Sequence, residues 1–261
     1  MTKQEKPLIL VTNDDGITAP GIRALIRWMN GLGEVVVVAP NSPQSGMGHA
    51  ITIHETLRCE SVTMDAGPQL EYSCSGTPVD CVKLAVHELL DRRPNLIVSG
   101  INHGSNASVN VIYSGTMSAA VEGAMQRIPS IGFSLLDYSW DADFSHAESY
   151  IKHLALDVLD QGLPEGVCLN VNIPKATHEP YKGLKVCRQT MGHWEEDFDV
   201  RQDPTGKPYY WMRGQFVDSD GGSDSDIWAL NHHYLSVVPV QFDLTNHASL
   251  PTLRSRFDHE S

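Results

Sequence analysis

The chain has 261 residues, a length that fits one large domain or two small ones. With 41% hydrophobic and 20% charged residues, its composition excludes a wholly disordered chain. The formal net charge of −13 disfavours binding to a nucleic-acid polymer or to an anionic membrane, since both need a positive protein face.

The first two-thirds of the chain read as alternating strands and helices. Leu8–Thr12 is a short apolar run of the kind that forms a buried parallel strand. Apolar residues at i, i+3, i+4 and i+7 from Ile22 to Met29 predict a helix after it, with Gly33 as its C-cap. The β-branched run Glu34–Ala39 predicts a second strand. This succession is a βαβ unit, which is expected to cross over right-handedly.

The same alternation continues along the chain. Thr77, Pro78 and Asp80 predict a helix start with an N-cap, a proline at the first position and an acid at the third. Ser145 and Glu148 predict a capping box for a later helix. The remaining elements are a helix over Thr116–Arg127 and strands over Leu96–Ser99, Ser130–Leu135 and Val167–Ile173.

Two segments depart from this alternation. Residues 50–74 and 180–245 contain short apolar runs between turn signals, which we interpret as hairpins added to an α/β core. Their strands are expected at Ile51–Thr56, Leu70–Cys74, Lys185–Gln189 and Tyr234–Leu244.

The sequence indicates a cytoplasmic protein. No apolar run approaches the roughly 18 residues that span a membrane, and a polar turn follows Leu8–Val11 at once, unlike a signal peptide. The five cysteines are widely spaced and contain no CxxC pair. We therefore expect buried, reduced thiols in place of a disulfide framework or a zinc site.

Polar loops follow three of the predicted strands. Ligands of an open parallel α/β sheet bind beyond the carboxyl ends of its strands, so these loops are expected to contain the binding or catalytic residues. They are rich in oxygen ligands, glycine and small hydroxyls, and we expect them to converge on one edge of the sheet. The loops are Asn13–Gly16, Pro40–Gly46 and Gly100–Asn106, and the last runs on to a helix start at Tyr113–Thr116.

The adjacent pair Asp14 and Asp15 is the strongest indication of a metal site in these loops. Two unit charges about 4 Å apart repel by roughly 1–4 kcal/mol at effective dielectrics of 80 to 20, so their placement calls for compensation. A divalent cation, Mg²⁺ or Mn²⁺ shared with a substrate phosphate, supplies it, with Ser45 and Asn102 as neutral oxygen ligands. A solvated acidic turn that caps the next helix explains the dipeptide alone, whereas the partner loops favour the metal.

The segment Ser114-Gly115-Thr116 is a candidate anion site. Free backbone N–H groups and the positive end of the helix dipole would meet a phosphate there. Plain N-capping by Ser114 or Thr116 is the equally consistent alternative. Asn13 and Asn106 are candidate donors to phosphate oxygens, and turn building explains either residue as well.

Near the C-terminus, Asp243, Thr245 and His247 would share one face of an extended segment. At this spacing a carboxylate can orient an imidazole. We predict that His247 protonates the leaving group, provided that folding, or a tail from another subunit, brings it near Asp14. A polar strand end at the surface is the alternative.

Other catalytic templates are missing from the sequence. It contains no GxGxxG after a strand, no GxxxxGK[ST], no HExxH and no GxSxG, which disfavours a Rossmann-type oxidoreductase or transferase. An aspartyl-phosphate phosphatase of the haloacid-dehalogenase type wants D-x-D after its first strand, whereas Asp14 and Asp15 are adjacent here. A phosphatase and a non-enzymatic sensor of a metal–nucleotide complex remain as the two candidate classes.

Together these motifs resemble the SurE family of survival proteins, which are metal-dependent 5′/3′-nucleotidases. The resemblance covers nearly the whole chain. It rests mainly on Asn13–Gly16, Ala19–Gly21, Ala39–Pro40, Ser45–Gly46, Gly76–Pro78, Ser99–Asn102, Gly104, Asn106 and Tyr113–Thr116. Shorter matches are at Asp80–Val82, Glu122–Gly123, Ser225–Asp226 and Ser236–Val237.

The resemblance implies a Rossmann-like three-layer α/β sandwich with a mostly parallel sheet and a β-rich C-terminal extension. We expect residues 1–179 to form the core and residues 180–261 to form a hairpin and an oligomerisation segment packing back on it. A homodimer or homotetramer follows from that extension.

The resemblance also implies hydrolysis of nucleoside 5′- and 3′-monophosphates, with short polyphosphate as a further substrate. One Mg²⁺ or Mn²⁺ per subunit is expected as cofactor. By motif position, Asp14, Asp15, Ser45 and Asn102 are the metal ligands, and both aspartates are catalytic. Asn13, Asn106, Ser114, Gly115 and Thr116 are the phosphate-binding residues, and Asp243 and His247 match a C-terminal D-x-T-x-H motif with a suggested catalytic role.

Overall fold

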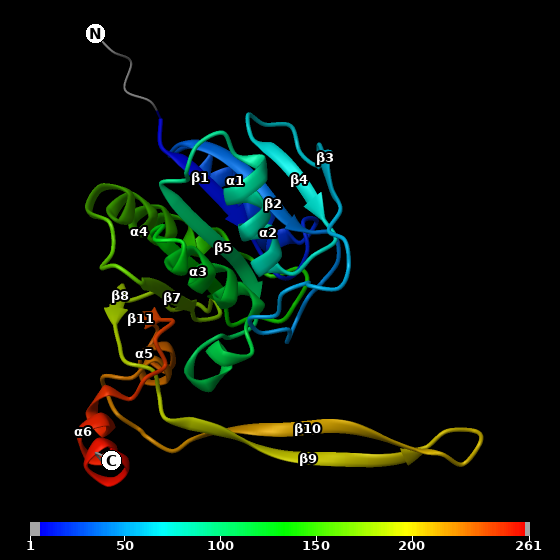
Figure 1. The fold of residues 1–261 in the computed structure, drawn as a ribbon, viewed down its shortest axis with the longest axis vertical. Helices are drawn as coiled ribbons and strands as arrows, with labels where there is room; N and C mark the ends of the chain where they lie inside the picture. Colours follow the sequence, from blue (N-terminus) through cyan, green and yellow to red (C-terminus); the bar gives the residue numbers. More distant parts are fainter. Residues whose placement is uncertain (1–5, 259–261) are drawn as a thin grey trace.

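A computed structural model describes residues 6–258, and a nine-stranded sheet dominates it (Figure 1). Its strands are β1 (Leu8–Thr12), β2 (Glu34–Pro40), β3 (Cys59–Val62), β4 (Leu70–Cys74), β5 (Leu96–His103), β6 (Ser130–Leu135), β7 (Val167–Ile173), β8 (Leu184–Val186) and β11 (Leu235–Gln241). Their order across the sheet is β3-β4-β2-β1-β5-β6-β7-β11-β8. Neighbours are parallel from β4 through β7, whereas β3 and β11 run antiparallel to β4 and β7.

Helices cover both faces of this sheet. One face carries α1 (Pro20–Met29) and α4 (Glu148–Gln161), and the other carries α2 (Pro78–Leu84) and α3 (Gly115–Met125). Successive strand residues face opposite sides, so Ile9 and Val11 join the first core while Leu8 and Leu10 join the second. The three-layer α/β class with a mostly parallel sheet is therefore confirmed.

The predicted start of α2 is also confirmed. The Thr77 hydroxyl accepts a hydrogen bond from the backbone N–H of Asp80 at 3.1 Å. In return, the Asp80 carboxylate accepts one from the backbone N–H of Thr77 at 2.9 Å. Two orphan donors of the helix end are thus satisfied. The helix then passes into a π-helical turn over Ala85–Leu89.

Two other helix-end predictions are wrong. Asp143 accepts a hydrogen bond from the backbone N–H of Ser145, and the chain makes a 3₁₀ turn there before α4 begins at Glu148. Ser145 is therefore outside the N-cap position and forms no capping box. The C-cap of α1 is Asn30, so Gly33 lies beyond the helix end.

The segment 50–74 only partly follows the prediction. It supplies the hairpin β3–β4 at the sheet edge, and Leu70–Cys74 is a strand. The predicted strand Ile51–Thr56 is absent from the described residues. The backbone N–H and hydroxyl of Thr52 bond the Asp80 carboxylate at 3.0 and 2.6 Å, which holds this stretch to the α2 cap instead of to a neighbouring strand.

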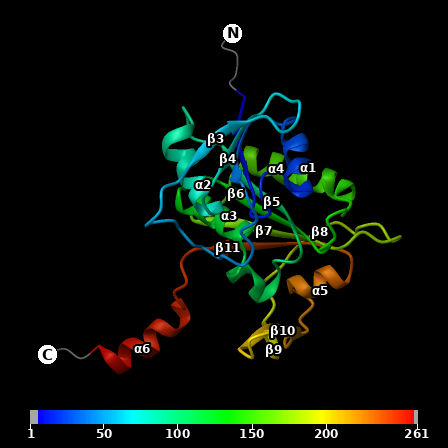
Figure 2. The same cartoon turned by 90° about the vertical axis from the view of Figure 1, so that its right-hand side faces the viewer.

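The C-terminal third divides between the sheet and two projections. β8 and β11 extend the main sheet beyond β7. The predicted strands Lys185–Gln189 and Tyr234–Leu244 were too long, because β8 ends at Val186 and β11 covers only Leu235–Gln241. The strands β9 (Gly192–Gln202) and β10 (Pro208–Asp218) form a separate antiparallel hairpin that projects from the body (Figure 1). After α5 (Asp226–Asn231) and β11, α6 (Leu250–Phe257) also lies apart from the sheet (Figure 2).

The division of the chain at residue 179 stays a prediction. β11 from the C-terminal segment pairs directly with β7, so both segments contribute strands to one sheet. Within residues 6–258, none of the helices is long and apolar enough to cross a membrane.

The prediction of reduced thiols is wrong for two of the five cysteines. Cys59 and Cys74 lie directly opposite each other in the β3–β4 register and form a disulfide. Cys81, Cys168 and Cys187 are free and buried, as expected. Strand register places the pair, and register depends on the whole hairpin, so spacing along the sequence did not reveal it.

Candidate active site at the carboxyl edge of the sheet

The candidate site lies where the connections of the sheet change direction. From β1 the chain moves to β2 on one side, and it later returns to β5 on the other side of β1. In open α/β sheets such a switch point opens a crevice for ligands at the carboxyl ends of the strands. Two hydrogen bonds join the loops there: Gln44 N–H donates to the Asp14 carbonyl at 2.7 Å, and His103 N–H donates to the Asp15 carboxylate at 3.1 Å.

A cavity of about 390 Å³ opens at this edge. Its lining unites residues from the three polar loops, the start of α3 and the hairpin β9–β10. The lining residues are Asp14, Ser45, Gly46, Asn102, His103, Ser105, Asn106, Asn110, Tyr113, Ser114, Tyr138 and Trp194. Five residues singled out by the sequence therefore share one cavity: Asp14, Ser45, Asn102, Asn106 and Ser114.

Asp14 is buried against the start of α3, with only 4% of its surface exposed. Its carboxylate accepts a hydrogen bond from the Thr116 hydroxyl at 2.5 Å. A Cβ atom at Gly115 would come within 2.8 Å of the Asp14 Cβ, so only glycine lets the helix begin this close to the carboxylate. Burial, and then the charge of Asp15, raise the pKa of Asp14 to about 6.

Asp15 is held by a histidine that sequence reasoning missed. The Asp15 carboxylate accepts a hydrogen bond from the backbone N–H of His103, and the ring Nδ1 of the same residue lies 3.2 Å from it. The His103 ring stacks on Trp140 at 5.7 Å between centroids and meets the edge of Phe144 at 5.2 Å. Its position in the sequence could have identified it, since His103 directly follows the candidate ligand Asn102.

The residues at this edge fit a divalent cation. Asp14 and Asp15 supply two negative charges whose mutual repulsion a cation relieves, and Ser45 and Asn102 add neutral oxygens. The side-chain N–H of Asn102 donates to the carbonyl of Gly104 at 2.9 Å, which leaves its Oδ1 available to a cation. Among residues 6–258, no three His, Cys, Asp or Glu side chains gather into a metal cluster, so a cation here depends on neutral oxygens.

The start of α3 combines capping with an anion-binding geometry. The Ser114 hydroxyl accepts a hydrogen bond from the backbone N–H of Met117 at 3.0 Å, so Ser114 is the N-cap. Thr116 is fully buried and turned toward Asp14. Gly115 is the first residue of the helix, at the positive end of its dipole.

Asn13 is fully buried beside this pair of carboxylates. Its side-chain N–H donates to the carbonyl of Gly16 at 2.9 Å, which is the turn-building role. Its Oδ1 is buried and has no hydrogen-bond partner within the described part of the chain. Such an orphaned oxygen is costly unless a donor arrives with a ligand.

Asn106 belongs to a buried network of amides that the sequence did not reveal. Its side-chain N–H donates to the Ser134 hydroxyl, and its backbone N–H donates to the Asn172 Oδ1, both at 2.8 Å. The side chain of Asn170 donates to the Asn106 carbonyl at 2.8 Å. Polar residues inside the apolar strands β6 and β7 were the available signal, and they fix the loop at the cavity wall.

Asp243 and His247 form a bonded pair away from this cavity. The Asp243 carboxylate lies 2.7 Å from the His247 Nε2, and both side chains are exposed. Asp243 also accepts the backbone N–H of Thr245, so the segment is a turn where an extended strand was predicted. Neither residue lines the Asp14 cavity; both follow β11 on the way to the projecting helix α6 (Figure 2).

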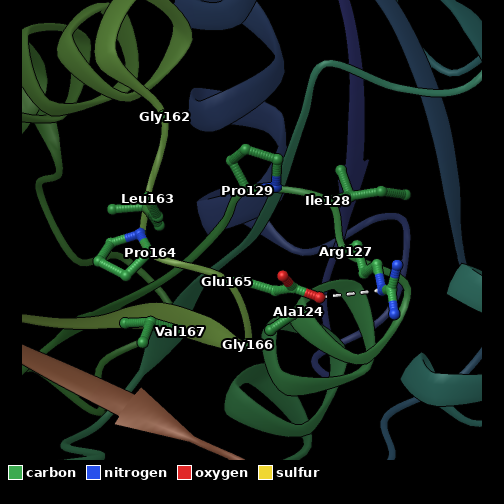
Figure 3. A pocket seen from close by; sticks show the side chains of 10 residues that line it. All are labelled: Ala124, Arg127, Ile128, Pro129, Gly162, Leu163, Pro164, Glu165, Gly166 and Val167. Atoms are coloured by element: carbon green, nitrogen blue, oxygen red, sulfur yellow. Dashed lines mark ion pairs between the residues drawn. The ribbon is translucent and has the colours of Figure 1, made fainter.

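A separate hollow of about 290 Å³ lies before the strands β6 and β7, at the opposite edge of the sheet (Figure 3). An exposed ion pair between Arg127 and Glu165 spans 3.1 Å beside it. The hollow contains none of the predicted site residues, so the candidate active site is the cavity at the carboxyl edge.

Comparisons with known proteins agree with the motifs. Residues 9–196 match the family described as "Survival protein SurE". The chain is 62% identical over 250 residues to the 5′-nucleotidase SurE of Flavobacterium psychrophilum, covering 96% of this chain and 97% of that protein. It is 62% identical over 253 residues to the 5′-nucleotidase SurE of Christiangramia forsetii, covering 97% of each.

The fold agrees as well. A crystal structure of the SurE protein from Aquifex aeolicus superposes with a TM-score of 0.82 at 38% identity, covering 96% of this chain and 99% of that one. The family resemblance read from the motifs is thereby confirmed.

Proposed function

The chain belongs to the SurE family, and on this premise we propose that it is a phosphomonoesterase hydrolysing nucleoside 5′- and 3′-monophosphates to nucleoside and phosphate. Relatives aligned over 96–97% of the chain carry the name 5′-nucleotidase. The observation that carries the proposal is the buried Asp14 carboxylate at the start of α3, inside a cavity lined by polar loops. Short polyphosphate is a further candidate substrate.

The proposal includes one Mg²⁺ or Mn²⁺ per subunit, held by Asp14, Asp15, Ser45 and Asn102. The paired carboxylates and neutral oxygens suit such a cation, as does the raised pKa of Asp14. When bound, the cation polarises a phosphate oxygen and lowers the pKa of water.

The chain's own residues then bind and orient the phosphate. Uncatalysed hydrolysis of a phosphate monoester is so slow that an enzyme must accelerate it by up to ~10²¹-fold. A single preorganised donor contributes roughly 3 kcal/mol, so several must act together. The start of α3 at Ser114, Gly115 and Thr116 binds the phosphate oxygens through its dipole and N–H groups. The side-chain amides of Asn13 and Asn106 each have a second N–H besides the one bonded to Gly16 or Ser134, and these two N–H groups complete the proposed donor set.

Thr116 and His103 position the two carboxylates. The Thr116 hydroxyl holds one oxygen of Asp14, and the backbone and ring of His103 hold Asp15. Both carboxylates are therefore oriented before substrate binds, which removes a reorganisation cost from the reaction.

We assign the proton for the leaving group to His247, oriented by Asp243. The 2.7 Å contact between the two side chains supports the orienting role. Because this pair does not line the cavity of its own chain, it must come from another subunit. We therefore propose a homodimer or homotetramer formed through the C-terminal third, where Phe198, Tyr210 and Trp211 of the hairpin are exposed.

The assembly is tested by light scattering. A dimer or tetramer of the 28.8 kDa chain at micromolar concentration is expected, and a monodisperse monomer would exclude the subunit-swapped proton donor. The cytoplasmic location stays a prediction, which fractionation of the native cells tests.

The activity is tested by phosphate release from a panel of nucleoside monophosphates with Mg²⁺, with Mn²⁺ and with a chelator. Release that depends on the cation is expected. A sensor that only binds the nucleotide would release no phosphate from these substrates or from a chromogenic phosphate ester.

A further inference from the structure

A second hollow adjoins the cavity around Asp14. It measures about 450 Å³ and shares Gly46, Asn110, Tyr113 and Trp194 with that cavity. The rest of its lining comes from the hairpin β9–β10: Glu196, Met212, Arg213 and Gly214. The two hollows are therefore contiguous.

Aromatic and thioether side chains line this second hollow. The side chains of Tyr113 and Trp194 are 54% and 38% exposed, although both are large and apolar. Met212 is also exposed and lies on the hairpin wall. Flat aromatic faces that border a polar cavity are the surfaces on which nucleobases stack.

Trp194 is held in place without any ligand. Its indole N–H donates to the Asn110 Oδ1 at 2.8 Å, and its ring meets the edge of Phe216 at 5.9 Å between centroids. A Cβ atom at Gly214 would lie 3.2 Å from the indole of Trp194. The absence of a side chain at Gly214 therefore leaves space for the ring. A side chain fixed in advance loses little entropy when a ligand stacks on it.

Gly46 lies where the two hollows meet. Its φ of +73° is a left-handed conformation, and a Cβ there would meet no atom within 4 Å. The backbone therefore leaves open space at the junction of the two hollows.

We propose that this second hollow is the nucleobase subsite, in which the base stacks on Trp194 and Tyr113. The proposal rests on the proposed function, because it places the phosphate of the same molecule in the Asp14 cavity. Stacking accepts any base, since every base has a π-face. The rim residues Glu196 and Arg213 supply an acceptor and a donor for the base edge.

The proposal is tested by comparing AMP with ribose 5-phosphate, which lacks the base. In Trp194→Ala, the ratio of kcat/KM for AMP to that for ribose 5-phosphate is expected to fall roughly tenfold. Trp194→Phe keeps an aromatic face and is expected to retain most of the ratio. Trp28→Phe is the matched control for Trp194→Phe, because Trp28 is buried in the core and lies outside both linings.

Equal losses on the two substrates in Trp194→Ala would overturn the subsite, since they would show that Trp194 only shapes the phosphate cavity. An unchanged ratio would overturn it as well. A second readout does not depend on turnover: adenosine is expected to quench the tryptophan fluorescence of the wild type and of Trp28→Phe, but not that of Trp194→Phe. Undiminished quenching in Trp194→Phe would overturn the subsite, whereas a wild type that binds adenosine and hydrolyses neither ester would overturn the proposed function alone.

Discussion

The hydroxyl of Thr116 donates to the carboxylate of Asp14 over 2.5 Å, joining the end of β1 to the first turn of α3 across 102 positions of sequence. Both residues are buried. The bond favours the charged carboxylate, but burial and the neighbouring Asp15 outweigh it, so the pKa of Asp14 remains raised to about 6. Asp14 is thus an oriented carboxylate whose charge needs a partner.

Asp14→Asn is predicted to abolish phosphatase activity and yet to stabilise the metal-free protein at pH 8. The folded pKa of about 6 lies above the ordinary value of 3.8, so the ionised carboxylate destabilises the fold above pH 6. The shift corresponds to a gain in unfolding free energy of about 3 kcal/mol at most. Urea unfolding in chelator measures it, and the gain should vanish as the pH falls below 4.

An active, chelator-insensitive Asp14→Asn variant would contradict the metal assignment. A variant that is inactive and also less stable at pH 8 would contradict the electrostatic argument.

Gly115→Ala is predicted to lower both kcat and stability. The added Cβ would lie 2.8 Å from the Asp14 Cβ, so the helix start or the carboxylate must shift. Overpacking of this kind costs about 1–3 kcal/mol. Steady-state kinetics and thermal unfolding measure the two effects. Gly31→Ala is the control, because its Cβ would make only an ordinary 3.4 Å contact; wild-type kinetics in Gly115→Ala would refute the close approach.

Glu122→Gln is predicted to destabilise the protein at neutral pH. The Glu122 carboxylate is buried and lies 2.8 Å from the Lys83 ammonium and 3.2 Å from the His49 ring. Despite burial, hydrogen bonds from His49, Gln126 and Lys83 lower the pKa of Glu122 to about 2. Breaking such a pair costs on the order of 3 kcal/mol.

The same carboxylate predicts part of the acid unfolding. Because its folded pKa lies below the ordinary 4.5, its stabilisation is present above pH 4.5 and is lost as the pH falls toward 2. Unfolding free energies measured from pH 5 to pH 2 should therefore fall less steeply in Glu122→Gln than in the wild type. Parallel curves would show that Glu122 is not the group responsible.

His247→Ala is predicted to slow hydrolysis of nucleoside monophosphates by roughly 10²–10⁴-fold, the usual contribution of a positioned general acid. An aryl phosphate, whose leaving group needs little protonation, should lose much less. Asp243→Asn should show a weaker form of the same selectivity, because it removes the partner at 2.7 Å. Equal losses on both esters, or none, would leave the general acid unassigned.

Local sequence patterns were sufficient for the α/β class and for the strand ends that carry the candidate site. Five of the singled-out residues, including Asp14, Asn102 and Ser114, line one cavity. The reason is physical: a buried parallel strand must be apolar, and the first polar residues after it must lie at its carboxyl end. The capping pair Thr77 and Asp80 was equally readable, because both partners lie within one helical turn.

Only the tertiary structure decided which groups hold the site residues. His103 bonds Asp15, Thr116 bonds Asp14, and Asn172 holds Asn106, in each case across 66 to 102 positions of sequence. The disulfide between Cys59 and Cys74 and the contact of Trp194 with Asn110 likewise depend on strand register and on the direction of the hairpin. The sequence by itself determined where polar groups follow buried strands, whereas strand order and register determined their partners, because those partners are brought together only by packing between distant segments.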